Sequence, residues 1–183
     1  QMSSKGAQVF CNACGKSWTL NYYGELEADS GETEFKFPTD WYDWEREQVK
    51  KEIAHHKQRE RFCYMQTPGL FEHFNTVFGI ENHLLYTALY PEELCELYRR
   101  QAEWTMRFAD KCISLGADMI HISDDWGSQK DMMFSPQTWR DIIKPHLKKV
   151  IDHVHSRGAF CSLHSDGCIS KVTDELAELG IDL

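Results

Sequence analysis

Alternating strand and helix patterns between residues 59 and 183 constrain the fold of this chain more than any other feature. Short apolar runs at 61–67, 117–123 and 159–163 are each followed by residues with helical spacing, and glycines stand where the helical spacing ends. Parallel strands are the arrangement that this alternation favours, because parallel neighbours need a long crossover connection. We therefore predict an α/β fold with parallel strands and covering helices.

Four helices are expected beside these strands. Pro91 opens a long helix that ends at Gly116, and Ser135 with Pro136 begins another that runs through Val154 and His155. The remaining two are expected at 70–78 and 169–179, and 180–183 has the character of one more strand. A closed eight-stranded barrel takes roughly 250 residues. The pattern therefore corresponds to part of a (β/α)8 barrel, about three units and the opening of a fourth.

Residues 1–57 have a different pattern, and we expect them to form a segment separate from 58–183. Cys11 and Cys14 form a Cys-x-x-Cys pair followed by Gly15, which is typical of a zinc knuckle and supplies half of a four-ligand site. A pair without metal and a redox pair remain alternatives. Residues 17–24 favour a short strand and turn, and 40–53 an amphipathic helix with Asp40 at its N-cap.

Three phrases in this segment carry a resemblance. They are Cys-x-x-Cys-Gly-Lys-x-Trp at 11–18, Gly-Glu-Thr-Glu-Phe at 31–35 and Pro-x-Asp-Trp-Tyr-x-Trp-Glu-Arg-Glu at 38–47. Together they resemble the zinc-ribbon tail of certain bacterial 1-acyl-glycerol-3-phosphate acyltransferases. The earlier cysteine pair of that tail is absent, and so is the catalytic motif of the acyltransferase domain. The resemblance therefore implies half of a zinc ribbon, and it implies no acyltransferase activity.

Composition excludes several classes of partner. The net charge of -9 and the lack of a cation cluster argue against nucleic-acid binding. No apolar run reaches the roughly 20 residues of a membrane span, and no secretory signal begins the sequence, so we expect a cytoplasmic protein.

Seven cysteines are an odd number without a disulfide pattern. We expect four of them to be small structural residues: Cys63, Cys95, Cys112 and Cys161.

Polar residues directly follow two neighbouring predicted strands. One cluster runs from Asp124 to Gln129 and the other from His164 to Gly167. The carboxyl ends of parallel strands meet at one edge of the sheet, where substrates bind in parallel α/β folds. We expect catalytic roles for Asp124, Asp125, His164 and Asp166, and substrate-supporting roles for Trp126, Gln129 and Ser165.

Each of these residues also has a structural interpretation. An aspartate after a strand can cap the following turn, and Asp166-Gly167 is a common turn dipeptide. Three other histidines are interpreted as structural. His121 lies in mid-strand and is expected as a core or interhelical residue, while His153 and His155 lie near a helix C-terminus, where a positive charge is favourable.

Several phrases between 61 and 183 look like the uroporphyrinogen decarboxylase superfamily. They lie at 67–74, 115–129, 133–140 with 143–145, and 163–167 with 179–182. The resemblance implies a (β/α)8 barrel whose C-terminal face binds a small-molecule substrate. It also implies one of two activities: the porphyrinogen decarboxylase of that superfamily, or its zinc-dependent corrinoid or thiol methyltransferases.

The methyltransferase-like branch is the closer of the two. The decarboxylases have an N-terminal arginine-rich segment and an early strand-end aspartate, which this sequence lacks. The methyltransferases bind zinc through His-x-Cys, where His164 matches and Asp166 replaces the cysteine. The resemblance thus implies zinc at His164 and a corrinoid protein as methyl donor or acceptor, with a homo-oligomer possible. The alternatives are cofactor-free decarboxylation of uroporphyrinogen and a non-catalytic, truncated interaction module.

Overall fold

The computed structural model describes residues 8–10, 17–20, 26–28 and 43–183, with side chains from Glu47 onward. The chain divides into two compact units, residues 1–47 and residues 48–183. The predicted metal pair of Cys11 and Cys14 and the predicted N-cap Asp40 lie outside the described residues.

The first unit contains a small antiparallel sheet with the order β1-β2-β3. Its strands are β1 (Gln8–Phe10), β2 (Ser17–Leu20) and β3 (Leu26–Ala28). In this sheet Val9 pairs with Trp18, and Trp18 pairs with Ala28. The strand expected after the Cys-x-x-Cys pair is thereby confirmed over residues 17–20.

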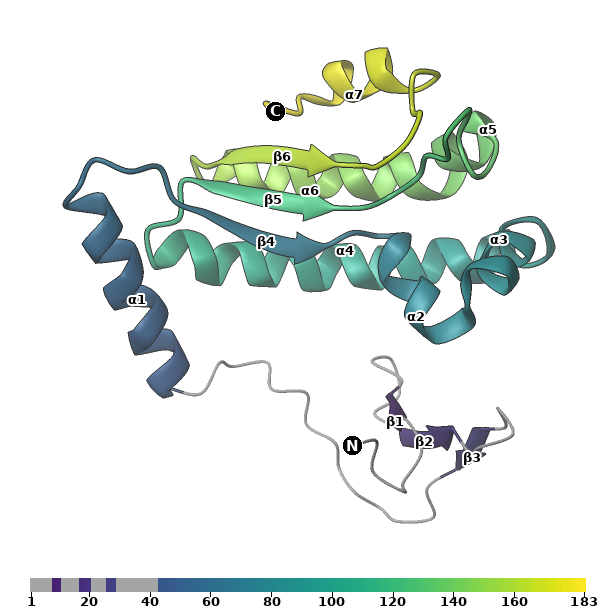
Figure 1. Cartoon of the computed structure of the whole chain (residues 1–183), viewed down its shortest axis with the longest axis horizontal. Helices are drawn as coiled ribbons and strands as arrows, with labels where there is room; N and C mark the ends of the chain where they lie inside the picture. The colour runs from purple at the N-terminus through teal and green to yellow at the C-terminus, as the bar shows by residue number, and fades with distance from the viewer. Residues whose placement is uncertain (1–7, 11–16, 21–25, 29–42) are drawn as a thin grey trace. The chain divides into compact units, whose positions relative to one another are not determined.

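The second unit alternates helices with three strands (Figure 1). In chain order its elements are α1 (Asp43–Lys57), β4 (Tyr64–Pro68), η1 (Glu72–Phe74), α2 (Asn75–Phe78), α3 (Ile80–Leu89), α4 (Pro91–Ser114), β5 (Met119–Ser123), α5 (Pro136–Thr138), η2 (Trp139–Ile143), α6 (Lys144–Ser156), β6 (Phe160–His164) and α7 (Thr173–Leu179).

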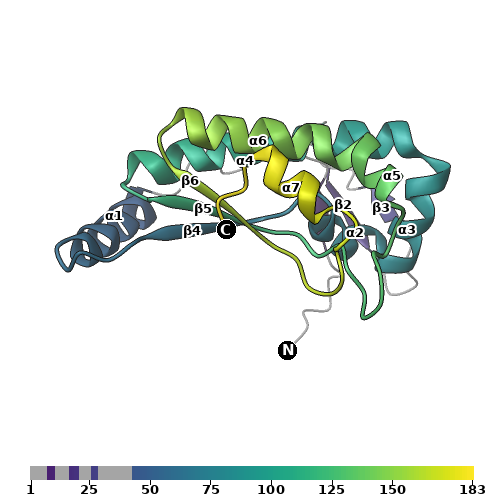
Figure 2. The same ribbon diagram turned by 90° about the horizontal axis from the view of Figure 1, so that it is seen from above.

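The three strands form one parallel sheet in the order β4-β5-β6. Met119 pairs with Tyr64 on one side and with Phe160 on the other, and Ser123 pairs with Pro68 and His164. Helices α4 and α6 pack on the same face of this sheet (Figure 2). The predicted alternation of parallel strands and crossover helices is therefore confirmed.

The helices lie where the spacing predicted them, and the structure adds two elements to this prediction, α3 and the π-helical turn η2. Helix α4 begins at Pro91, as expected for proline in a first turn. The residues at 70–78 form η1 and α2, and a further helix, α3, separates them from α4. The helix predicted from Ser135 does begin there, because the Ser135 hydroxyl accepts a hydrogen bond from the Thr138 backbone N–H at 2.9 Å. It continues through a π-helical turn, η2, into α6.

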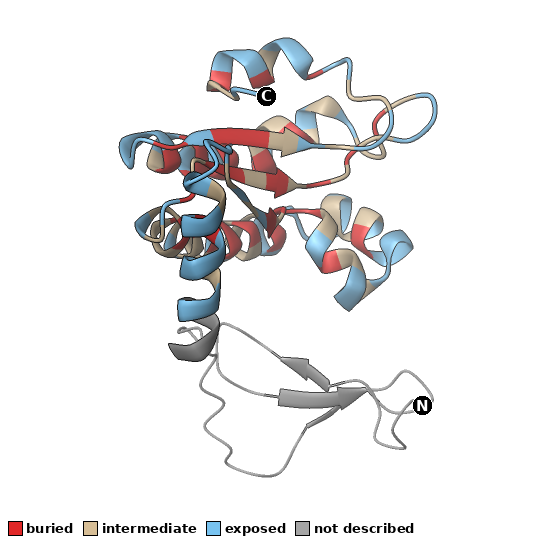
Figure 3. Ribbon diagram, turned by 60° about the vertical axis from the view of Figure 1, so that its left-hand side comes forward, coloured by how far each residue is buried: buried red, intermediate tan, exposed pale blue. Residues whose placement is uncertain are grey.

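The core lies between the sheet and the two long helices (Figure 3). Ile120 and Ile122 of β5 are almost fully buried, and so are apolar residues of α4 and α6, among them Tyr98, Ala109, Cys112, Leu147, Val150 and Val154. Burial of a large apolar side chain stabilises a fold by roughly 1.5–3 kcal/mol. This layer therefore holds the strand ends in place.

Helix α1 packs within the second unit through its last two turns. Ile53 is only 7% exposed, and Lys57 forms an ion pair with Asp118, which also accepts a hydrogen bond from the Cys63 backbone N–H at 2.7 Å. For this reason the compact unit begins at residue 48, ten residues before the expected boundary between 57 and 58.

Residues 181–183 lie beside β6. The backbone N–H of Asp182 donates to the Cys161 carbonyl at 2.9 Å, and that of Leu163 donates to the Leu183 carbonyl at 3.0 Å. The Asp182 carboxylate accepts a hydrogen bond from the Cys161 N–H and contacts His155. These bonds start a fourth strand-like pairing, at the place where one more strand was expected.

Among the described residues no helix is both long and apolar enough to cross a membrane. The five described cysteines are free thiols. Cys112 and Cys161 are buried, as expected of small structural residues, while Cys63 and Cys95 are half-buried.

Candidate functional site

Two loops meet at the carboxyl ends of β5 and β6. The first begins at Asp124, directly after β5, and the second begins at Ser165, directly after β6. Because Ser123 and His164 are register partners in the parallel sheet, both loops leave it at the same edge. The two predicted polar clusters therefore lie together.

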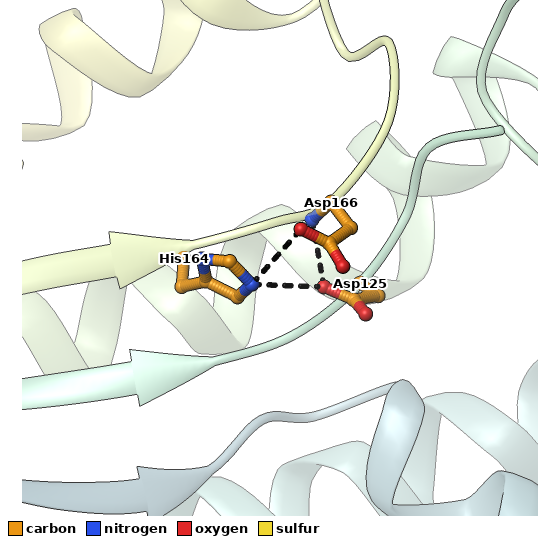
Figure 4. Close-up of side chains that lie close together, drawn as sticks. All are labelled: Asp125, His164 and Asp166. Atoms are coloured by element: carbon orange, nitrogen blue, oxygen red, sulfur yellow. Dashed lines mark hydrogen bonds and ion pairs between the residues drawn. The ribbon is translucent and has the colours of Figure 1, made fainter. Parts of the chain in front are cut away.

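Three of the four predicted catalytic side chains form one cluster (Figure 4). The His164 Nε2 lies 3.3 Å from the Asp166 Oδ1 and 3.6 Å from the Asp125 Oδ1. The same Asp125 oxygen accepts a hydrogen bond from the Asp166 backbone N–H at 2.7 Å. The side chain of Asp125 is 27% exposed, that of His164 47% and that of Asp166 78%. The cluster is open to small molecules.

Asp124 lies apart from this cluster and is fully buried. Its carboxylate accepts hydrogen bonds from the backbone N–H groups of Leu70, Phe71 and Glu72, at 2.7 to 3.2 Å. Burial raises the pKa of Asp124 to about 6, and the backbone N–H groups oppose that shift. Asp124 thus has a structural role, but it caps the turn that follows β4 and not the turn directly after Asp124 itself, which was the expected structural alternative.

The two loops are locked together by close backbone contact. The Cys168 N–H donates to the Ser128 carbonyl at 2.8 Å. A Cβ on Gly127 would lie 2.5 Å from the Asp166 carbonyl oxygen, and one on Gly167, whose φ is +76°, would lie 2.4 Å from the Gly127 carbonyl carbon. Only glycine fits at these two positions; Gly167 directly follows Asp166, and Gly127 lies two residues after Asp125.

The predicted substrate-supporting residues have different environments. Ser165 accepts a hydrogen bond from the Trp126 backbone N–H at 2.9 Å, so its hydroxyl joins the two loops. The Trp126 side chain is fully buried and packs edge-on against Trp139, with ring centroids 5.7 Å apart. Gln129 is exposed on the loop after β5. Ser165 and Trp126 are therefore placed to support the loops, and Gln129 is accessible from solvent.

His121 extends the site along the sheet. It was expected as a core or interhelical residue, but it is half-buried on β5, and its ring lies 6.3 Å from the ring of His164 between centroids. Its Nδ1 lies 2.8 Å from the Ser162 hydroxyl on β6. Burial and the nearby His164 lower the pKa of His121. Strand periodicity could have identified this residue from the sequence. Ser162 and His164 lie on one face of β6, and His121 is the register partner of Ser162.

The His164, Asp125 and Asp166 side chains have the composition and spacing of a metal site. Each offers one ligand atom, and these atoms lie within 4.8 Å of one another. In a tetrahedral zinc site, bonds of about 2.0–2.1 Å place ligand atoms roughly 3.3 Å apart, close to the 3.3 and 3.6 Å found here. Three protein ligands leave one position free, as in catalytic zinc sites. The donors therefore fit a divalent ion.

Comparison with known proteins agrees with this architecture. Residues 75–183 match the family model described as uroporphyrinogen decarboxylase (URO-D). Among solved structures, a methyltransferase from Methanosarcina mazei has a similar fold, with a TM-score of 0.61 and 18% sequence identity. The similarity covers 73% of this chain and 39% of the methyltransferase chain, so the chain spans well under half of that protein's length. No curated protein sequence matches the chain.

Proposed function

The chain belongs to the uroporphyrinogen decarboxylase family, and we propose that it acts in the methyltransferase-like branch, in methyl transfer between a corrinoid protein and a small thiol. In this proposal His164, Asp125 and Asp166 hold a divalent metal ion, with zinc the expected ion. The chain supplies three parallel strands of a barrel whose substrate face is C-terminal, and its strand-end loops lie where such a substrate binds.

One observation carries the proposal: the His164 Nε2 lies 3.3 and 3.6 Å from carboxylate oxygens of two different loops. An imidazole between two carboxylates is also a common ion pair, but the close backbone contact at Gly127 and Gly167 fixes the spacing of the two loops that carry the aspartates. Prearranged ligands are what a metal site needs, because binding then costs little reorganisation.

The residues have distinct roles in this proposal. When bound, zinc would lower the pKa of a thiol and favour the nucleophilic thiolate. Asp166 occupies the position of a cysteine in the zinc-binding members, so these residues would give an ion two oxygen ligands and one nitrogen ligand, a harder set than one with thiolate. Ser165 fixes the distance between the loops, and Asp124 holds the turn after β4 that borders the same edge of the sheet.

The proposal is tested by metal content. We expect about one zinc ion per chain at this cluster, in addition to any ion held by Cys11 and Cys14. The His164→Ala variant should lose that ion and weaken cobalt binding at least tenfold, because it removes one of three ligands. His153→Ala serves as the matched control, since His153 pairs with Asp110 on the helical layer. Metal content that is unchanged in His164→Ala would overturn the metal site.

A functional assay separates the proposal from its rival. Methyl transfer from methylcobalamin to a thiol should depend on the metal and stop after chelation. Cofactor-free decarboxylation predicts instead that added uroporphyrinogen loses carboxylates in the presence of a chelator, with Asp125 as an acceptor for pyrrole N–H groups. Mass analysis of both reactions in the same buffer distinguishes the two, and inactivity in both would favour a non-catalytic module.

A further inference from the structure

A polar pair lies on the sheet face that α4 and α6 leave uncovered. His121 of β5 and Ser162 of β6 are register partners, and the His121 Nδ1 lies 2.8 Å from the Ser162 Oγ. Strand alternation places Ile120 and Ile122 on the opposite, helix-covered face, where both are buried. His121 is half-buried and thus accessible from the uncovered face.

This pair lies one row deeper along the strands than His164. Ser123 and His164 form the last row of the sheet, and His121 and Ser162 form the row two residues before it, a step of about 7 Å along a strand. The rings of His121 and His164 are 6.3 Å apart between centroids. This spacing would let a small molecule bound at the cluster of Asp125, His164 and Asp166 contact His121 through an atom two or three bonds from its reacting atom.

The residue types at this depth are unusual for a barrel interior. Layers inside eight-stranded barrels are filled mainly by branched apolar side chains. A histidine and a serine there depart from that pattern, and such local departures concentrate at functional sites. No described residue hydrogen-bonds the Nε2 of His121 in this structure. The Ser162 contact at the Nδ1 orients the ring, so the Nε2 can still form a hydrogen bond with a ligand.

We propose that His121 is a specificity-determining residue that hydrogen-bonds a second polar group of the substrate, with Ser162 as the positioning residue that orients its ring. The inference rests on the proposed thiol site and names its substrate class: a short thiol with a hydroxyl or similar hydrogen-bonding group two or three bonds from sulfur.

The test compares two thiols of the same carbon chain length on the full chain loaded with cobalt. Binding of 2-mercaptoethanol and of ethanethiol is measured from the cobalt absorption spectrum. We expect 2-mercaptoethanol to bind about fivefold more tightly, because one net hydrogen bond contributes roughly 1 kcal/mol. In His121→Phe that preference should disappear, while cobalt affinity stays within about threefold of the unaltered chain.

Two further variants separate a substrate contact from a structural effect. Ser162→Ala should reduce the preference without abolishing it, and His121→Gln should keep part of it, because the amide still forms a hydrogen bond. His153→Phe, on the helical layer, should keep it in full. A preference that survives in His121→Phe, or that is lost equally in His153→Phe, overturns the assignment of His121 alone. If the unaltered chain binds neither cobalt nor thiol, the proposed function fails, and this inference fails with it.

Discussion

At the scale of single residues, the adjacent aspartates Asp124 and Asp125 have opposite environments. Asp124 is fully buried and accepts hydrogen bonds from three backbone N–H groups of the turn after β4. Asp125 is part-exposed and contacts the next loop through Asp166 and His164. The Asp124 N–H still donates to the His164 carbonyl, so the extended pairing continues one residue past β5, and successive side chains there leave the chain on opposite faces. One aspartate therefore stabilises the fold while its neighbour faces the site.

We predict that Asp124→Ala destabilises the chain by about 3 kcal/mol or more, because three buried N–H groups lose their acceptor at roughly 1 kcal/mol or more each. Denaturant unfolding followed by circular dichroism measures this free energy. Asp118→Ala is the matched control: that carboxylate accepts one backbone N–H and pairs with Lys57 near the other end of the sheet. A smaller loss in Asp124→Ala than in Asp118→Ala would contradict the capping role.

At the scale of elements, backbone contact between the two site loops decides whether the cluster exists. Gly127 and Gly167 approach so closely that neither position has room for a Cβ. The loops come from neighbouring parallel strands, so their starting points are set by the sheet register. Their ends are joined by backbone hydrogen bonds and by the ion pair of Lys171 with Asp131.

Gly167→Ala should therefore weaken cobalt binding about tenfold or more, because the loop must move and the aspartates beside it lose their spacing. Gly158→Ala is a close control, since its φ of +77° equals that of Gly167 to within a degree and nothing lies within 4 Å of the added Cβ. That variant should cost only the roughly 1–2 kcal/mol of a left-handed residue. Equal cobalt affinities in the two variants would show that the backbone contact between Gly127 and Gly167 does not shape the site.

A second contact between elements is sensitive to pH. His83 of α3 is fully buried, with its Nδ1 2.8 Å from the Asn75 side chain and its Nε2 2.7 Å from the Tyr98 hydroxyl on α4. Burial lowers the pKa of His83 to about 4. The unfolded chain therefore binds a proton at about pH 6.5 that the folded chain refuses until about pH 4. The stability that neutral His83 contributes is present above pH 6.5 and is lost as the pH falls towards 4.

The change measured for this contact is the difference in unfolding free energy between the unaltered chain and His83→Gln. That difference should shrink between pH 7 and pH 4.5, by up to about 3 kcal/mol, because only the unaltered chain loses stability through this group. Other titrating groups are common to both chains and cancel in the comparison. A difference independent of pH would show that the pKa of His83 is the same in the folded and unfolded chains, and it would contradict the lowered pKa.

At the scale of the whole molecule, family membership and the candidate site both fall within residues 48–183. The family model matches residues 75–183. The last turns of α1 belong to the same compact unit as these residues. Ile53 and Lys57 are the contacts that attach this helix to the unit. The N-terminal residues 1–47 form the other unit, and the expected metal pair of Cys11 and Cys14 belongs to it.

Shortened chains test this division. A chain that begins at residue 48 should keep the helical circular dichroism signal of the second unit, and its His164 cluster should bind cobalt within about threefold of the same cluster in the full chain. A chain that begins at residue 58 should be less stable by about 2 kcal/mol, because it loses the buried side chain of Ile53. Equal stability of the two shortened chains would mean that α1 is not part of the compact unit.

The sequence by itself determined the element types, the parallel α/β class and the family, because these depend on local periodicity, on glycine and proline positions and on short phrases. It also predicted that the clusters after 117–123 and 159–163 share one edge, since parallel strands end on the same side. Tertiary structure alone decided which side chains meet there. Burial assigned Asp124 to the turn at 70–72, loop contact joined Asp125 to His164 and Asp166, and strand register placed His121 beside Ser162. These outcomes depend on distances between residues far apart in the chain, which local patterns do not encode.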